Sequence, residues 1–213
     1  YTGITEYDKE GKLNGATKRL VTWEAFAEAT ISRCVRPEPG DPILILTAVG
    51  NDITLAEACL AAGTRAGADA QMMVIPRRHQ GAPRKEKPIL ADAIRASKVV
   101  LALDVDFLGP AAAEARSKGT SFLHTSVNGV EDYAVRALLD VDTEAMNRNA
   151  ELVAHLWDQT KVCRVTSPQG TDVSFELMPR ESIVGDGAIS GAGEVDFYPG
   201  TQVGIAPVEE TIN

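Results

Sequence analysis

Basic side chains gather in the loop that follows the second predicted strand. The chain has a formal net charge of −9, yet the segment 76–87 carries Arg77, Arg78, His79, Arg84, Lys85 and Lys87. Guanidinium groups bind carboxylates through paired hydrogen bonds, so this local reversal of charge can hold an anionic substrate or an acidic patch of a second subunit. A solvated charged loop is the alternative interpretation. We predict that Arg77 and Arg78 bind substrate.

The loop after the third predicted strand holds two carboxylates, Asp104 and Asp106. Alternate residues of a strand point to opposite faces, so the two would not act as a pair if the strand persisted. Open α/β sheets bind ligands at the carboxyl ends of their strands, and we therefore predict both as substrate-binding residues. His124, at the end of the fourth predicted strand, is the best catalytic candidate among the three histidines, since imidazole titrates near neutral pH.

The sequence shows no common active-site motif that would complete this group of candidate residues. No two histidines lie four residues apart, and no Ser-His-Asp or Cys-His arrangement can be recognised by spacing. The loop at 48–52 has neither a GxGxxG motif nor a Walker lysine, which leaves a nucleotide-binding function weakly supported. Asp52 in that loop is expected to be a helix N-cap. The sequence by itself does not display a whole active site.

Alternating strands and helices must position these residues. Short apolar runs predict buried parallel strands at 43–47, 69–76, 98–103 and 120–124. Helices are predicted at 53–66, 88–96, 110–118 and 141–160, and a further helix is expected to begin at Thr22 after a poorly ordered arm or edge ribbon at 1–20. This order predicts an α/β fold with a doubly wound, mostly parallel sheet in residues 1–160.

The hydrophobic period changes to two after residue 160. Apolar and polar residues alternate on both sides of a turn at 168–170, which predicts an antiparallel hairpin. Six glycines between Gly185 and Gly204 predict a loop-rich segment that ends in a short strand at 202–206. We expect residues 161–213 to be the β-rich, loop-rich start of a second, incomplete domain.

Composition excludes several classes of function. The acidic net charge repels nucleic acid and anionic membranes, so neither is expected as a partner. The sequence has no run of 18 apolar residues and no signal-peptide pattern, and we expect a soluble, cytoplasmic protein. Cys34, Cys59 and Cys163 are far apart and odd in number, which predicts reduced, mostly buried thiols. Because it begins with Tyr1 and stops at Asn213, the chain is expected to be a trimmed or processed piece.

Two motifs in the last third carry a family resemblance. They are the hairpin VTSPQGTDVSFEL at 165–177, with a TxxxGTD core, and YPGTQVGIAPVEETIN at 198–213, which is similar to a Pro-x-x-Glu-Val-x-x-Ala-Pro-x-Glu motif. Looser similarity covers PGDPILIL, the helix after GND, ASKVVLAL and the long helix before residue 160. On these motifs the chain resembles the aminopeptidase T (M29) family and its relative, the 2,5-dihydroxypyridine 5,6-dioxygenase family.

The resemblance implies a metal-dependent enzyme and makes Gln202 a catalytic candidate. In the peptidase family the glutamate of this motif is implied to bind a two-metal centre, and Gln202 stands in its place. An amide is a weaker ligand than a carboxylate, so Gln202 favours the dioxygenase branch, which is implied to hold one iron on two His and one carboxylate of a C-terminal domain. That branch also implies an acid-base histidine where this chain has Phe107 and Leu108. No metal ligands are expected in this chain; the implied divalent metal is Fe(II), or alternatively Zn or Co, bound beyond Asn213.

Three hypotheses on function remain open. The leading one is the N-terminal portion of a mononuclear non-haem iron, ring-cleaving, dioxygenase-like enzyme that acts on a small (hetero)aromatic acid or amide. Its expected partners are the small-molecule substrate and a C-terminal domain or partner chain, within a homo-oligomer. The alternatives are a metallo-aminopeptidase, a hydrolase similar to leucyl aminopeptidase, and a non-catalytic or processed subunit that needs a partner chain.

Overall fold

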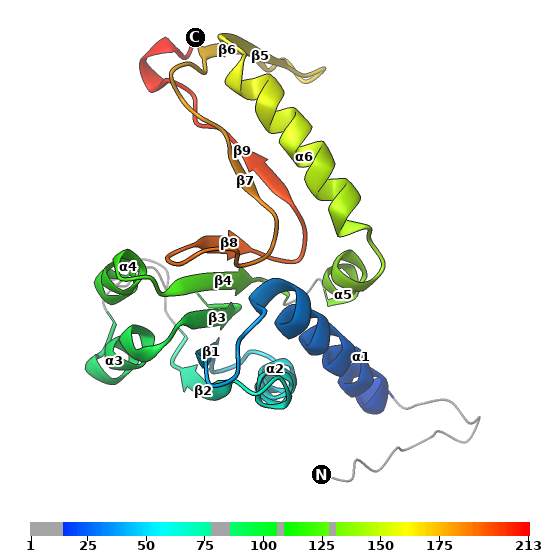
Figure 1. The fold of residues 1–213 in the computed structure, drawn as a ribbon. Coiled ribbons are helices and arrows are strands. Elements are labelled where there is room, and N and C mark those ends of the chain that lie inside the picture. The colour runs from blue at the N-terminus through cyan, green and yellow to red at the C-terminus, as the bar shows by residue number, and fades with distance from the viewer. Residues whose placement is uncertain (1–14, 78–85, 106–108, 128–130) are drawn as a thin grey trace, which may run out of the picture. The chain divides into compact units, whose positions relative to one another are not determined.

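A parallel sheet forms the centre of the first part of the chain (Figure 1). The computed structural model describes residues 15–77, 86–105, 109–127 and 131–213. Within these residues, five strands pair in the order β2-β1-β3-β4-β8, and every pair is parallel. The strands are β1 (Pro42–Ala48), β2 (Asp69–Ile75), β3 (Val99–Leu103), β4 (Ser121–Thr125) and β8 (Val195–Phe197). The predicted α/β class and doubly wound parallel sheet are confirmed.

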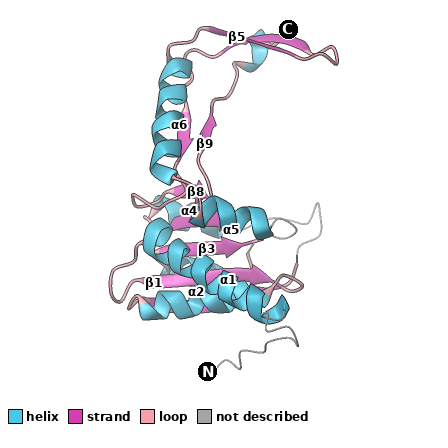
Figure 2. Ribbon diagram, turned by 90° about the vertical axis from the view of Figure 1, so that its right-hand side faces the viewer, coloured by secondary structure: helices cyan, strands magenta, loops and turns pink. Residues whose placement is uncertain are grey.

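Helices cover both faces of this sheet (Figure 1). One face packs under α1 (Gly15–Ala29), α2 (Ile53–Arg65) and α5 (Glu131–Leu139), and Figure 2 looks onto this side. The other face packs under α3 (Pro88–Ala96) and α4 (Pro110–Ser117). Successive residues of β1 alternate between the two cores, with Ile43 and Ile45 in one and Leu44 and Leu46 in the other. Burial on both faces is the reason that the strand is a continuous apolar run in sequence.

Two helix starts show how local chemistry sets the element ends. The Asp52 carboxylate accepts hydrogen bonds from the backbone N–H of Thr54 at 3.1 Å and from the indole Nε1 of Trp23 at 3.2 Å, so Asp52 is the N-cap of α2, as predicted. Gly109 has no side chain with which to cap α4, and the buried carboxylate of Glu86 accepts from the N–H groups of Ala111 and Ala112 instead. A carboxylate at this end also favours the helix dipole.

The first helix differs from its prediction. It begins at Gly15, not at Thr22, so the arm expected at 1–20 is wrong for the residues from 15 onward, and residues 1–14 lie outside the described part. Its last turn is a π-helix, Thr30–Val35, which ends where Arg36 takes a left-handed conformation with φ 50°. Helix α5 was not predicted at all.

The fifth strand comes from the segment that sequence periodicity assigned to the second domain. In β8, Val195 pairs with Phe122 and Phe197 pairs with His124 of β4. Tyr198, directly after β8, is buried and stacks on Phe26 at 5.8 Å between ring centroids. The compact units of the structure are accordingly residues 1–141 with 188–199, and residues 142–187 with 200–213. The boundary near residue 160 remains a prediction.

The second unit is built on one long helix and two small antiparallel sheets. Helix α6 (Thr143–Asp158) begins at the N-cap Asp142 and buries Ala150 and Ala154. The hairpin β5 (Val162–Thr166) and β6 (Asp172–Glu176) is antiparallel, as predicted, and β7 (Ile183–Gly185) pairs with β9 (Gln202–Gly204). A short 3-10 helix, η2, spans Glu209–Thr211.

Two further expectations can be compared with the described residues. Cys34, Cys59 and Cys163 are all free thiols, and the first two are buried. None of the helices in the described part of the chain is long and apolar enough to cross a membrane.

Candidate functional site

The strand order creates a topological switch point between β1 and β3. From β1 the chain passes outward to β2, and β3 then forms on the opposite side of β1. At such a point the loops leaving adjacent strands diverge and open a crevice at the carboxyl ends, where open α/β sheets bind ligands. The turn after β1 and Asp104 after β3 lie at this switch point, where the rule for open α/β sheets places a ligand.

Asn51 joins these two loops. Its Nδ2 donates to the carbonyl oxygens of Leu103 at 3.3 Å and Asp104 at 3.2 Å, both at the end of β3. Its Oδ1 accepts a hydrogen bond from Nη2 of Arg77, which follows β2, at 3.0 Å. One amide side chain thus connects the carboxyl ends of three neighbouring strands, β2, β1 and β3.

Asp104 ends β3 and does not continue it. Its φ of 52° lies in the left-handed region, which Asp adopts more readily than most residues. Its N–H donates to the carbonyl of Thr125 at 2.9 Å, and its carboxylate accepts from the N–H of Val127 at 2.8 Å. The carboxylate therefore ties the end of β3 to the segment after β4. Because the strand stops, an argument from strand alternation does not apply to Asp104 and its neighbours.

His124 belongs to the face of the sheet that α3 and α4 cover. Phe122 lies in the core on that face and Leu123 in the core on the other, so His124 shares the face of Phe122 by strand alternation. The imidazole is half-buried and meets the ring of Phe197 edge-on, with 5.1 Å between centroids. Such an edge-to-face contact favours one orientation of the imidazole.

The predicted site residues are thus distributed over separate places. Arg77 and Asp104 come together around Asn51, while His124 lies on the face under α3 and α4. Arg78 and Asp106 lie outside the described residues. Gln202 belongs to the second unit, where it is exposed on β9 and pairs with Gly185 of β7. The roles assigned to all these residues remain predictions.

Asn51 was not among the predicted site residues. It lies in the loop at 48–52, three residues after the end of β1, and a loop that follows the first strand of a doubly wound sheet is a signal for a residue that bridges loops.

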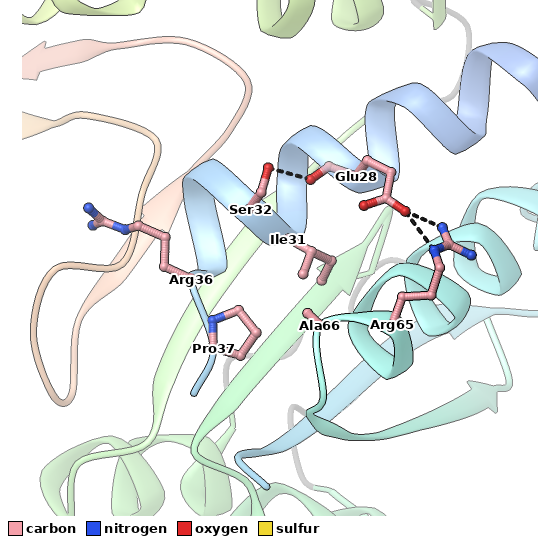
Figure 3. A pocket seen from close by; sticks show the side chains of 7 residues that line it. All are labelled: Glu28, Ile31, Ser32, Arg36, Pro37, Arg65 and Ala66. Carbon is pink, nitrogen blue, oxygen red and sulfur yellow. Dashed lines mark hydrogen bonds and ion pairs between the residues drawn. The ribbon is translucent and has the colours of Figure 1, made fainter. Parts of the chain in front are cut away.

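A hollow of about 400 Å³ lies beside the π-helix and the end of α2 (Figure 3). Arg65 and Arg36 both line it, but each is engaged: the guanidinium of Arg65 pairs with the Glu28 carboxylate, and Arg36 donates to the carbonyl of Ile189 at 2.8 Å. Figure 3 shows the two arginine side chains pointing away from one another. This hollow therefore offers no concentrated positive charge to a ligand.

The described residues do not form a metal site. Across those ranges, no group of three or more His, Cys, Asp or Glu side chains could hold a metal ion. The described residues therefore do not by themselves supply the ligand set of a metal site.

Comparisons with known proteins agree with this fold. The structure of 2,5-dihydroxypyridine dioxygenase from Pseudomonas putida KT2440 is similar with a TM-score of 0.72 and 17% identity, over 91% of this chain and 58% of that one. Wild-type AmpT from Thermus thermophilus is similar with a TM-score of 0.61 and 21% identity, over 92% of this chain and 63% of that one. The chain therefore spans about three fifths of these structures, and at such identities the likeness concerns the fold. No curated protein matches the sequence.

A match to a family model identifies the family of the chain more firmly than the structural comparisons do. The model described as NicX, 2,5-dihydroxypyridine 5,6-dioxygenase, matches residues 22–213, which is nearly the whole sequence. The resemblance predicted from the two motifs of the last third is confirmed. The chain belongs to the 2,5-dihydroxypyridine 5,6-dioxygenase family.

Proposed function

We propose that this chain is the N-terminal portion of a ring-cleaving, dioxygenase-like enzyme that acts on a small (hetero)aromatic acid or amide. The family match supports this kind of chemistry. The observation that carries the proposal is the Arg77–Asn51–Asp104 connection at the switch point, where Asn51 presents a guanidinium at the carboxyl edge of the sheet. In this proposal Arg77 binds an anionic group of the substrate, because guanidinium and carboxylate form charge-assisted hydrogen bonds.

The proposed metal is a single divalent ion bound by residues beyond this chain, in a C-terminal domain or a partner chain. Fe(II) is favoured, with Zn or Co as the alternative, because Gln202 stands where the peptidase motif has a glutamate. In the proposal Gln202 contacts the substrate or a metal-bound ligand through its amide, and His124 holds or transfers a proton at the α/β unit. The active form is proposed to be a homo-oligomer.

A metallo-aminopeptidase is the second candidate, supported by the fold shared with AmpT. The test uses the complete protein with two assays: oxygen consumption with Fe(II) and a dihydroxypyridine, and release of arylamine from a leucyl arylamide with Zn or Co. We expect oxygen uptake and no hydrolysis. Robust hydrolysis without oxygen uptake would show that the peptidase alternative is right.

The third candidate, a non-catalytic or processed subunit, is tested by mass and by activity. The intact mass of the purified protein is compared with the 22.7 kDa calculated for these residues. If the protein isolated from its natural source has this mass, is inactive alone and becomes active when a second chain is added, the subunit hypothesis is supported.

Gln202→Ala tests the role of this side chain in the complete enzyme. Because the proposal gives the Gln202 amide a contact in the active site, we expect turnover to fall about tenfold or more. Because Gln202 is exposed on β9, the melting temperature should change by no more than about 2 °C. Full turnover with a lowered melting temperature would make Gln202 a structural residue. Glu210→Gln, at another exposed position of the second unit, is the control.

A further inference from the structure

An apolar hollow lies between α4 and the β4–β8 edge of the sheet. Its volume is about 470 Å³, which is within the range of small-molecule sites. The sheet contributes Phe122, Val195 and Phe197, and α4 contributes Ala112, Ala113 and Arg116. We call this space the α4–β8 hollow. It lies wholly within the first compact unit.

Two aromatic side chains of the sheet line the α4–β8 hollow opposite the small residues of α4. Phe122 is buried and belongs to the core under α3 and α4, so its ring is held in place. Phe197 remains 47% exposed although the edge contact with His124 fixes its ring at 5.1 Å. An exposed aromatic ring that is already oriented can stack on a flat apolar group at little entropic cost.

Arg116 supplies a positive charge to this apolar space. Its Nε donates to the carbonyl of Gly193 at 2.8 Å, and the structure shows no ion pair between Arg116 and any described carboxylate. The glutamate of the same helix, Glu114, is instead engaged by Arg95 at 2.9 Å and Lys118 at 2.7 Å. In a chain with a net charge of −9, a guanidinium that lines an apolar hollow and has no ion-pair partner among the described carboxylates is able to bind an anion.

Gly193 holds this arginine in position. It has φ +73°, and a Cβ there would lie 2.7 Å from the carbonyl oxygen of Arg116. The absence of a side chain lets the loop before β8 approach the end of α4, and the Gly193 N–H donates to the carbonyl of Gly119 at 3.0 Å. The loop therefore anchors Nε of Arg116, a residue that lines the hollow.

We propose that the α4–β8 hollow binds a flat apolar carboxylic acid, with the ring on the exposed side chain of Phe197 and the carboxylate on Arg116. A monoanion matches a single guanidinium, whereas a phosphate dianion would need more donors than the described wall provides. The proposal does not depend on the proposed function, because binding needs neither metal nor turnover.

Titration of the 213-residue chain with 2-naphthoate, followed by calorimetry, tests the proposal. We expect saturable one-to-one binding with a Kd of about 0.1 to 1 mM, typical of a ligand of this size. The neutral 2-naphthamide should bind about tenfold more weakly, because it lacks the charge that Arg116 recognises. Absence of saturation at about 10 mM would overturn the proposal.

Three variants locate the binding. Arg116→Gln should weaken 2-naphthoate about tenfold and remove the preference over the amide, and Phe197→Ala should weaken both ligands about fivefold. Arg148→Gln, on α6 of the other unit, removes the same single positive charge and should have no effect on the affinity for 2-naphthoate. If Arg148→Gln weakens binding as much as Arg116→Gln, binding is nonspecific and the proposal is wrong.

Two controls keep the outcome decisive. If Arg116→Gln lowers the melting temperature, Arg116→Lys is used in its place. Lysine keeps the positive charge but lacks the planar guanidinium, so this variant should bind 2-naphthoate with intermediate affinity. Sedimentation is measured with and without 2-naphthoate. A self-association that buries the hollow and excludes the ligand would show that a second copy of the chain occupies it, which would overturn the proposal.

Discussion

Arg77 is connected to the end of β3 through a single side chain: its Nη2 lies 3.0 Å from Oδ1 of Asn51, whose Nδ2 lies 3.2 Å from the carbonyl oxygen of Asp104. This arrangement links Arg77, which follows β2, to Asp104, which follows β3, through the side chain of Asn51. Under the proposed function, Asn51 positions the guanidinium of Arg77, and Arg77 binds the anionic group of the substrate.

Replacing Asn51 should uncouple the loops. Asn51→Ala removes the donor to the carbonyl groups of Leu103 and Asp104, and we expect the free energy of unfolding to fall by about 1 to 2 kcal/mol. In the complete enzyme, KM for an anionic substrate should rise with little change in kcat, because Arg77 loses its orientation. Urea denaturation and steady-state kinetics measure the two effects.

Arg77→Gln separates the two roles of this connection. It should reproduce the increase in KM but leave the unfolding midpoint near that of the wild type, because Arg77 is exposed and Asn51 still reaches β3. An Asn51→Ala protein with an unchanged unfolding midpoint and unchanged KM would contradict the proposed bridge.

Glu86 should be needed for the stability of α4. Its side chain is only 7% exposed and accepts from two N–H groups of the first turn, at 3.2 and 3.3 Å. Glu86→Ala leaves these donors without their acceptor and removes a charge that favours the helix dipole, so we expect a loss of about 1 to 2 kcal/mol in chemical denaturation. Glu86→Gln should lose less, since its amide oxygen can accept, and exposed Glu57→Ala on α2 should lose little. Equal effects of Glu86→Ala and Glu57→Ala would argue against the cap.

Acid should weaken the contact between Asp41 and Lys98. Burial of Asp41 raises its pKa, but the hydrogen bond from Lys98 Nζ at 2.8 Å, a second one from the Glu38 backbone and the Lys98 charge together bring the pKa below its ordinary value of 3.8. A lowered folded-state pKa means that the contribution is present above the unfolded pKa and is lost as pH falls through the folded one.

Melting temperatures of Asp41→Asn from pH 7 to pH 2.5 measure this effect. The variant should melt about 2 °C below the wild type near neutral pH, and the difference should vanish below the folded-state pKa of Asp41. The exposed Asp69→Asn on β2 serves as the comparison. A difference that stays constant over the whole range would exclude the ion pair as its source.

The three thiols should differ in reactivity. Burial raises the pKa of Cys59 to about 12, so it is not a thiolate at pH 8, and Cys34 is buried as well. Only the thiolate reacts readily with disulfide reagents, so half-buried Cys163 should react first in the native protein. Ellman titration of the wild type and Cys163→Ser checks this: the fast phase should disappear in the variant. Two fast-reacting thiols in folded protein would show that one core cysteine is accessible.

The local elements could be predicted from sequence where apolar runs were long and buried on both faces. Strands β1, β3 and β4 follow from such runs, whereas β2 was predicted from an apolar run that is only partly buried. Asp52 could be predicted as the N-cap of α2 because its side chain accepts a hydrogen bond from the nearby backbone N–H of Thr54. The contacts at the switch point are different. Asn51 reaches Leu103 and Asp104 across more than 50 residues of chain, and no local pattern encodes such a bond.

Short elements were missed for a related reason. Strand β8 has three residues, too few for a period, and its stability comes from pairing with β4 and from burial of Tyr198 beside it. The left-handed Asp104 was missed because an apolar strand followed by Asp is equally compatible with a longer strand.

Because residues 188–199 belong to the first unit, this unit can complete its fold only late in synthesis. A nascent chain that has emerged up to residue 160 can form β1 to β4, but Phe122 and His124 of β4 do not yet have their partners Val195 and Phe197. The first unit therefore completes its sheet only after almost the whole 213-residue chain has left the ribosome, and until then the open edge of β4 is exposed to other chains.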